Sequence, residues 1–105
     1  MGKAEIVKIA KKHIYLKDLS VTGCCLECTA DMDKVTVVQD GKYKLNIKPE
    51  REAHVGSFDL EVECKWIRKD NQTFEMGFQI ILSPSGRHFQ RYVDYLSYKF
   101  YKIET

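Results

Sequence analysis

Residues 58–66 read Phe58-Asp-Leu-Glu-Val-Glu-Cys-Lys-Trp66, an unbroken alternation of apolar and polar side chains. A period of two predicts a β-strand with one buried face and one face in water. After the polar stretch at residues 69–73, the alternation returns with apolar side chains at Phe74, Met76, Phe78, Ile80 and Leu82. The two segments predict an antiparallel hairpin that turns at residues 69–73.

Other short apolar stretches precede this hairpin. Ile14–Leu19 and Cys24–Cys28 predict two strands, and Ile6–Ile9 predicts another at the start of the chain. Val35–Val38 and the apolar residues of segment 43–47 flank Asp40-Gly41, a dipeptide that tolerates the positive φ angles of a tight hairpin turn. Short strands joined by short turns predict a mainly β fold, with about five to seven strands in a closed or nearly closed antiparallel barrel.

A helix is predicted only at the end of the chain. Ser83-Pro84 has the pattern of an N-cap residue followed by proline at the first helical position. Helical spacing then relates the apolar residues Phe89, Tyr92, Val93, Leu96, Phe100 and Ile103. We therefore expect a helix over about residues 84–103 that packs this stripe on the barrel. Tyr95, Tyr98 and Tyr101 either form an aromatic contact surface or rest their rings on neighbouring side chains.

Length and composition limit the classes of function. The chain has 105 residues, which suits one domain over residues 1–105. It is 44% hydrophobic and 30% charged, and no apolar run approaches the length of a membrane span. Four cysteines without regular spacing and the lack of a secretory leader indicate a cytoplasmic protein. The net charge of +2 is too small to indicate DNA binding.

The cysteines could form part of a metal site or pack in the core. Cys25 and Cys28 have the C-x-x-C spacing of many zinc sites, but no second pair follows. In an extended strand Cys24, Leu26 and Cys28 share one face, so the thiol of Cys25 points away from that of Cys28. Because free cysteine is among the most buried residue types, we expect core packing and no metal.

Common catalytic motifs are missing from the sequence, which has no G-x-S-x-G, no G-x-x-x-x-G-K-[ST] and no H-E-x-x-H. We therefore expect no enzymatic activity and no cofactor. A cysteine nucleophile paired with His13, His54 or His88 is the alternative.

The segment Asp18-Leu-Ser-Val-Thr-Gly23 combines a carboxylate, two hydroxyls and a glycine. In an extended strand Asp18 and Ser20 project from the same side, and Gly23 lets the chain turn back. A carboxylate suits the adjacent N1–H and N2–H₂ donors of guanine, while cationic side chains suit its O6 and N7 acceptors and its phosphates. Alternatively, Asp18 and Ser20 only cap the turn by bonding to nearby backbone N–H groups.

Lysines are concentrated before this segment. Lys3, Lys8, Lys11, Lys12 and Lys17 are accompanied by a single acidic residue, Glu5. They either form a positive field that attracts a phosphate-bearing ligand or keep an edge strand solvated.

Asp18-x-Ser20-x-x-Gly23 matches the [D/N]-x-S-x-x-G motif of PilZ domains, and Cys24-Cys-Leu26 stands where that family continues into a small, apolar strand. Met76-Gly-Phe-Gln-Ile80 resembles the family's late Gly-x-x-Phe strand, with Ile80 in place of the Phe. Ser83-Pro84 and residues 92–96 resemble its C-terminal helix. The resemblance covers residues 7–96 and implies a six-stranded antiparallel barrel with a C-terminal α-helix.

Many PilZ domains are receptors for the bacterial second messenger cyclic di-GMP, so the resemblance implies that Asp18, Ser20 and Gly23 hold guanine. Binding members also carry an Arg-x-x-x-Arg motif that clamps the phosphates, whereas the first arginine here is Arg51. Lys8 and Lys12 have the spacing of that motif and are the candidates for phosphate binding, although lysine lacks the planar fork of arginine.

The resemblance implies one of two functions. The first is a cyclic di-GMP effector domain that relays nucleotide binding to a protein partner in motility, pilus or exopolysaccharide control. The second is an adaptor that binds protein partners without nucleotide. Neither function requires DNA binding or membrane insertion.

Overall fold

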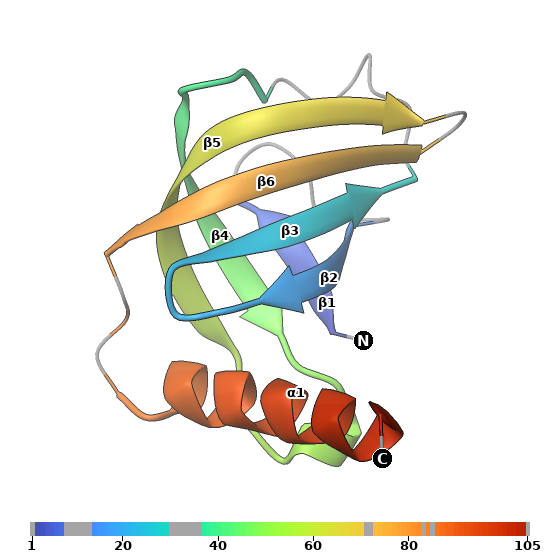
Figure 1. Ribbon diagram of the computed structural model, residues 1–105. Helices are drawn as coiled ribbons and strands as arrows, with labels where there is room; N and C mark the ends of the chain where they lie inside the picture. Colours follow the sequence, from blue (N-terminus) through green and yellow to red (C-terminus); the bar gives the residue numbers. More distant parts are fainter. Residues whose placement is uncertain are drawn as a thin grey trace.

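A computed structural model describes residues 2–7, 14–29, 37–70, 73–82, 84 and 86–104 of the chain. Its strands are β1 (Lys3–Ile6), β2 (Ile14–Leu19), β3 (Gly23–Cys28), β4 (Lys42–Lys48), β5 (Phe58–Asp70) and β6 (Thr73–Leu82), followed by helix α1 (His88–Glu104) (Figure 1). A short 3₁₀ helix spans Arg51–Ala53. The strands close into an antiparallel barrel in the order β1-β2-β3-β6-β5-β4. The predicted mainly β, six-stranded barrel with a C-terminal helix is confirmed.

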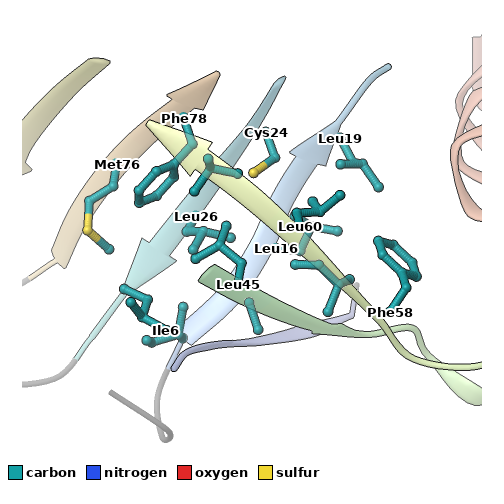
Figure 2. Close-up of a cluster of buried hydrophobic side chains, with 14 of the residues drawn as sticks. Ile6, Leu16, Leu19, Cys24, Leu26, Leu45, Phe58, Leu60, Met76 and Phe78 are labelled. Carbon is teal, nitrogen blue, oxygen red and sulfur yellow. The ribbon is translucent and has the colours of Figure 1, made fainter. Parts of the chain in front are cut away.

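The barrel interior is filled by apolar side chains from every strand. Figure 2 shows the central residues converging, with Ile6 from β1, Leu16 from β2, Leu26 from β3, Leu45 from β4, Leu60 from β5 and Met76 from β6. All six have relative exposures of 1% or less, and no polar or charged residue is buried in the described part of the chain. Burying each such side chain stabilises the fold by about 1.5–3 kcal/mol.

Strands β5 and β6 form the predicted hairpin, and they extend further than predicted, to a pair between Asp70 and Thr73. The alternation of β5 holds up to Cys64, which is buried. A bulge then shifts the register between Cys64 and Trp66, and Trp66 faces outward with 42% of its surface exposed. The prediction that Trp66 shares the buried face is therefore wrong, because one extra residue moves the following side chains to the opposite face.

The hairpin predicted around Asp40-Gly41 does not form. β4 already has β1 and β5 as its two neighbours, and Val37 and Val38 are not in a strand, while residues 35 and 36 lie outside the described part. A tight turn does form, with φ of 68° at Asp40 and a hydrogen bond from the Gly41 N–H to the carbonyl of Val38. The dipeptide thus indicated the turn but not the pairing of the strands.

The first strand also differs from the prediction, which placed it at Ile6–Ile9. β1 covers Lys3–Ile6, with Ala4 and Ile6 buried and Lys3 exposed on the other face. Residues 8 and 9 lie outside the described part.

Helix α1 begins at His88, so the predicted start at Pro84 is wrong. Gly86 has a φ of +110°, a conformation that no right-handed helix can pass through. The carbonyl of Arg87 accepts the first helical hydrogen bond, from the Arg91 N–H at 2.9 Å. Pro84 therefore belongs to the connection before the helix, and Ser83 lies outside the described residues.

The apolar stripe of α1 packs against one end of the barrel (Figure 1). The stripe residues Phe89, Tyr92, Val93 and Leu96 are buried, as predicted. Phe58 makes edge-to-face contacts with Phe89 and Tyr92, at centroid distances of 5.7 and 6.1 Å. Of the tyrosines beside the stripe, Tyr95 stacks on Tyr92, whereas Tyr98 is exposed. No helix in the described ranges is both long and apolar enough to cross a membrane.

Candidate ligand-binding site

The segment Asp18–Gly23 connects β2 to β3 through a turn held by its own polar groups. The Ser20 N–H donates to the Gly23 carbonyl at 2.8 Å, and the Ser20 hydroxyl accepts from the N–H groups of Thr22 and Gly23, each at 3.3 Å. Ser20 thus has the turn-capping contacts of the alternative interpretation. A Cβ at Gly23 would lie 2.6 Å from the Phe78 carbonyl oxygen, so glycine is required where β3 approaches β6.

Asp18 reaches the outer face of the barrel because β2 contains a bulge. The register shifts between Leu16 and Asp18, which leaves both Lys17 and Asp18 exposed before Leu19 returns to the interior. The carboxylate of Asp18 forms no hydrogen bond or ion pair with the other residues that the structure describes, so it can accept donors from a ligand.

A surface pocket of about 470 Å³ brings the predicted residues together with residues of β5 and β6. It is lined by Asp18, Ser20, Thr22, Gly23, Cys24, Cys25, Lys65, Trp66, Gly77, Phe78 and Gln79. Asp18 pairs with Cys25, Cys25 with Gly77, and Gly77 with Trp66, so one row of residues crosses β2, β3, β6 and β5. The carboxylate and the indole therefore lie at opposite ends of this row.

The indole of Trp66 packs against β6 at Gly77 because residue 77 has no side chain. A Cβ at Gly77 would lie 2.2 Å from the Cε2 and Nε1 atoms of the indole. Three strand spacings, or about 14 Å, separate the backbones of Trp66 and Asp18, and the indole extends from β5 over β6. Sequence alternation placed Trp66 in the core, and the glycine within an otherwise apolar strand was the signal that could have indicated this packing.

Charged residues form a second row on the same face. Glu75 pairs with Glu27 of β3 and Arg68 of β5 in the barrel register. Lys17 donates to one carboxylate oxygen of Glu75 and Arg68 donates to the other. The hydrogen bond from Lys17, together with that from Arg68, holds the pKa of the Glu75 carboxyl below its usual value, and the bond to Glu75 raises the pKa of Lys17.

Arg68 also lies near the indole, with its guanidinium carbon 5.7 Å from the centroid of Trp66. Lys65, which lines the pocket, forms an ion pair with Glu63 on the same strand. The alternation would have placed Arg68 on the buried face, because Arg68 follows the bulge that reverses the faces of β5, whereas Lys65 lies in the bulge itself and is exposed as the alternation predicts.

Lys8 and Lys12, the predicted phosphate-binding residues, lie outside the described part of the chain, and their role stays a prediction. Among the other lysines before Asp18, the structure describes Lys3 on β1 and Lys17. Of these two lysines, Lys17 forms an ion pair with Glu75, which lies close to the pocket.

The thiols of the C-x-x-C motif lie on opposite faces of β3, as predicted. Cys24, Cys28 and Cys64 belong to the core cluster, whereas Cys25 lies on the outer face but is only 7% exposed. Burial raises the pKa of the Cys24 thiol to about 12 and that of Cys25 to about 11, which disfavours the nucleophilic thiolate. Within the described ranges, no three His, Cys, Asp or Glu residues are grouped to hold a metal ion.

A larger pocket, of about 610 Å³, lies between β5 and the start of α1 and contains none of the residues of the Asp18–Gly23 motif. Its lining includes Lys44, Asp59, Glu61, Leu82 and His88. The Nδ1 atom of His88 accepts a hydrogen bond from the Gly56 N–H at 3.2 Å. We take the pocket of about 470 Å³ beside Asp18 as the candidate site, because it combines an exposed carboxylate, an exposed indole and nearby cations.

No protein-family model, no curated protein and no solved structure matches this chain. A function is therefore inferred from the chemistry of the pocket and from the resemblance of its motif.

Proposed function

We propose that this chain is a PilZ-type regulatory domain that binds cyclic di-GMP in the pocket beside Asp18–Gly23. In this proposal it relays binding to a protein partner in motility, pilus or exopolysaccharide control. The observation that carries the proposal is that Asp18 and Trp66 lie at opposite ends of one residue row across a single pocket. We expect it to act in the bacterial cytoplasm, without catalysis, cofactor or DNA.

The two ends of this row suit the two chemical features of a guanine base. The Asp18 carboxylate can accept hydrogen bonds from N1–H and N2–H₂ at the base edge. The exposed face of the Trp66 indole can stack on the π-face of the base, an interaction worth about 1–3 kcal/mol per base. The pocket volume of about 470 Å³ lies within the usual range for small-ligand sites.

The chain carries its own reporter for this test, because Trp66 is its one tryptophan. We expect cyclic di-GMP to quench the fluorescence of the full chain, with titration calorimetry giving the same affinity. Asp18→Ala should weaken binding about tenfold or more, since a charge-assisted hydrogen bond contributes about 1.5–3 kcal/mol. Asp59→Ala is the matched control, because Asp59 accepts a hydrogen bond from Asn46 on β4, away from the pocket.

Absence of heat and of fluorescence change at near-millimolar cyclic di-GMP would eliminate the receptor function. Equal affinities of the wild type and Asp18→Ala would move the base to another site.

The second candidate function is an adaptor that contacts proteins without nucleotide. It is favoured by exposed apolar side chains at the pocket end of β6, where Ile81 and Leu82 are 50% and 60% exposed. Val21, in the turn between β2 and β3, is 52% exposed. This turn lies beside β6, because the Ile80 N–H donates to the Thr22 carbonyl at 2.9 Å. The nucleotide titration separates the two candidates, because the adaptor predicts no binding by the wild-type chain.

A further inference from the structure

We infer that Lys17 and Arg68 form the phosphate-binding part of this site and that Glu75 occupies the position of the phosphate when no ligand is bound. The inference rests on the proposed function, because it concerns the same ligand. It assigns phosphate binding to residues of β2 and β5 instead of an arginine pair ahead of the motif.

The position of these residues matches the shape of a nucleotide. Glu75 and Arg68 stand two residues from Gly77 and Trp66 along their strands, so they project from the same face. Two residues of strand span about 7 Å. A ribose covers this kind of separation between a base and its phosphate, so a base stacked on Trp66 would carry its phosphate toward Glu75.

The contacts of Glu75 resemble those of a bound oxyanion. Its carboxylate is contacted by Lys17 from one side and by Arg68 from the other, with one oxygen for each cation. Cationic N–H donors that converge on oxygens are the usual ligands of phosphate, and Arg has further donors in its planar fork. A phosphate could therefore replace the carboxylate with little rearrangement of the two cations.

Exposure indicates that this exchange is accessible from solvent. The side chains of Lys17 and Arg68 are 46% and 66% exposed, whereas that of Glu75 is 13% exposed between them. A phosphate that takes the place of the carboxylate leaves both cations paired with an anion, so the exchange keeps their charge-assisted contacts. Glu75 lowers the local positive charge, and its neutralisation should strengthen the attraction of an anionic ligand.

Three variants of the full chain test the inference by fluorescence titration with cyclic di-GMP and, separately, with guanosine, which lacks phosphate. Glu75→Gln should bind cyclic di-GMP about threefold or more tightly than wild type, because it removes the competing charge. Arg68→Gln and Lys17→Gln should each weaken cyclic di-GMP about tenfold, because each removes a charge-assisted contact. The affinity of Lys17→Gln for guanosine should stay unchanged, because Lys17 contacts Glu75 and not the indole.

The matched control is Lys44→Gln, which removes a lysine from β4, a strand that does not carry the pocket. It should change neither affinity. Thermal unfolding of each variant, followed by circular dichroism, verifies that it is folded.

Three outcomes overturn the inference, and they can be distinguished from one another. If Arg68→Gln and Lys17→Gln bind cyclic di-GMP as tightly as wild type while Asp18→Ala binds it weakly, the phosphate assignment is wrong and the proposed function stands. Weaker binding by Glu75→Gln would overturn the role of Glu75 as a competitor. A wild-type chain that binds neither ligand would eliminate the proposed function and the inference together.

Discussion

The two halves of β5 continue one alternation of apolar and polar residues, but the alternation faces the core in the first half and faces outward at Trp66 in the second. From Phe58 to Cys64 the apolar residues face the barrel interior, between β4 and β6. After the bulge Trp66 faces outward and lines the candidate pocket, while Ile67 packs toward the core. The difference shows that a single inserted residue can convert the continuation of a core pattern into an exposed aromatic surface.

The largest effect is expected in the first half. Leu60→Ala should lower the free energy of unfolding by about 2–5 kcal/mol, because it leaves a cavity in the barrel interior. Trp66→Ala, in the second half, should cost less, about 1–2 kcal/mol, since 42% of the surface of Trp66 is exposed. Urea denaturation of both variants measures the two losses. Equal losses would show that Trp66 is a core residue.

An intermediate effect is expected at the contact that positions the indole. Gly77→Ala places a methyl group where the ring of Trp66 lies, so the ring must move away from β6. We expect a loss of about 1–3 kcal/mol in stability and a shift of the tryptophan emission to longer wavelength, measured by urea denaturation and fluorescence. Gly56→Ala is the control that leaves the emission unchanged, because a methyl group there meets His88 at the start of α1 and not Trp66. An unchanged emission in Gly77→Ala would mean that the indole does not rest on Gly77.

The smallest effect concerns the helix that covers the first half of β5. Tyr92 of α1 donates a hydrogen bond to Glu50 at 2.6 Å, and Lys99 lies 3.7 Å from the same carboxylate. Burial alone would raise the pKa of Glu50, but the bond from Tyr92 and nearby positive charges outweigh it and the pKa is lowered. A lowered pKa in the folded state stabilises the protein above the unfolded value near 4.5, and this contribution is lost as the pH falls through the folded value.

The stability advantage of the wild type over Glu50→Gln should therefore shrink below about pH 4.5, by less than about 1 kcal/mol for such a partly solvated group. Urea denaturation of both proteins at several pH values measures this difference. A constant difference from pH 7 to pH 3 would exclude a role for the charge of Glu50.

Local patterns were sufficient to predict the elements whose partners are near in sequence. Alternation predicted the span of β6 and the hairpin because β5 and β6 are joined by a short turn. It was wrong at the end of β6, where a register shift against β5 leaves Leu82 60% exposed. It failed at Asp40-Gly41, because β4 pairs on one side with β1, which comes from the start of the chain and closes the barrel. The helix start was wrong because proline also suits a connection, and the conformation of Gly86 cannot be read from its identity.

The candidate site was predicted in part for the same reason. Asp18, Ser20 and Gly23 form one local turn, so a motif could indicate them. Trp66 and Arg68 come from β5, and they reach the site only through the pairing of β6 with β5 and a bulge in β5. The adjacent apolar residues Trp66 and Ile67 and the glycine at position 77 mark this region in the sequence, but they do not specify which strands pair.

The hydrogen bond between the start of the chain and α1 bears on the order in which the elements fold. The Gly2 N–H donates to the Tyr92 hydroxyl at 3.2 Å, across 90 residues of sequence. The β5–β6 hairpin closes a short loop, because Asp70 already pairs with Thr73. The contacts of the N-terminal segment with β4 and α1 join residues that are far apart in the sequence. Because long loops close at a higher entropic cost, we expect the hairpin to form early and the N-terminal strand to complete the barrel last.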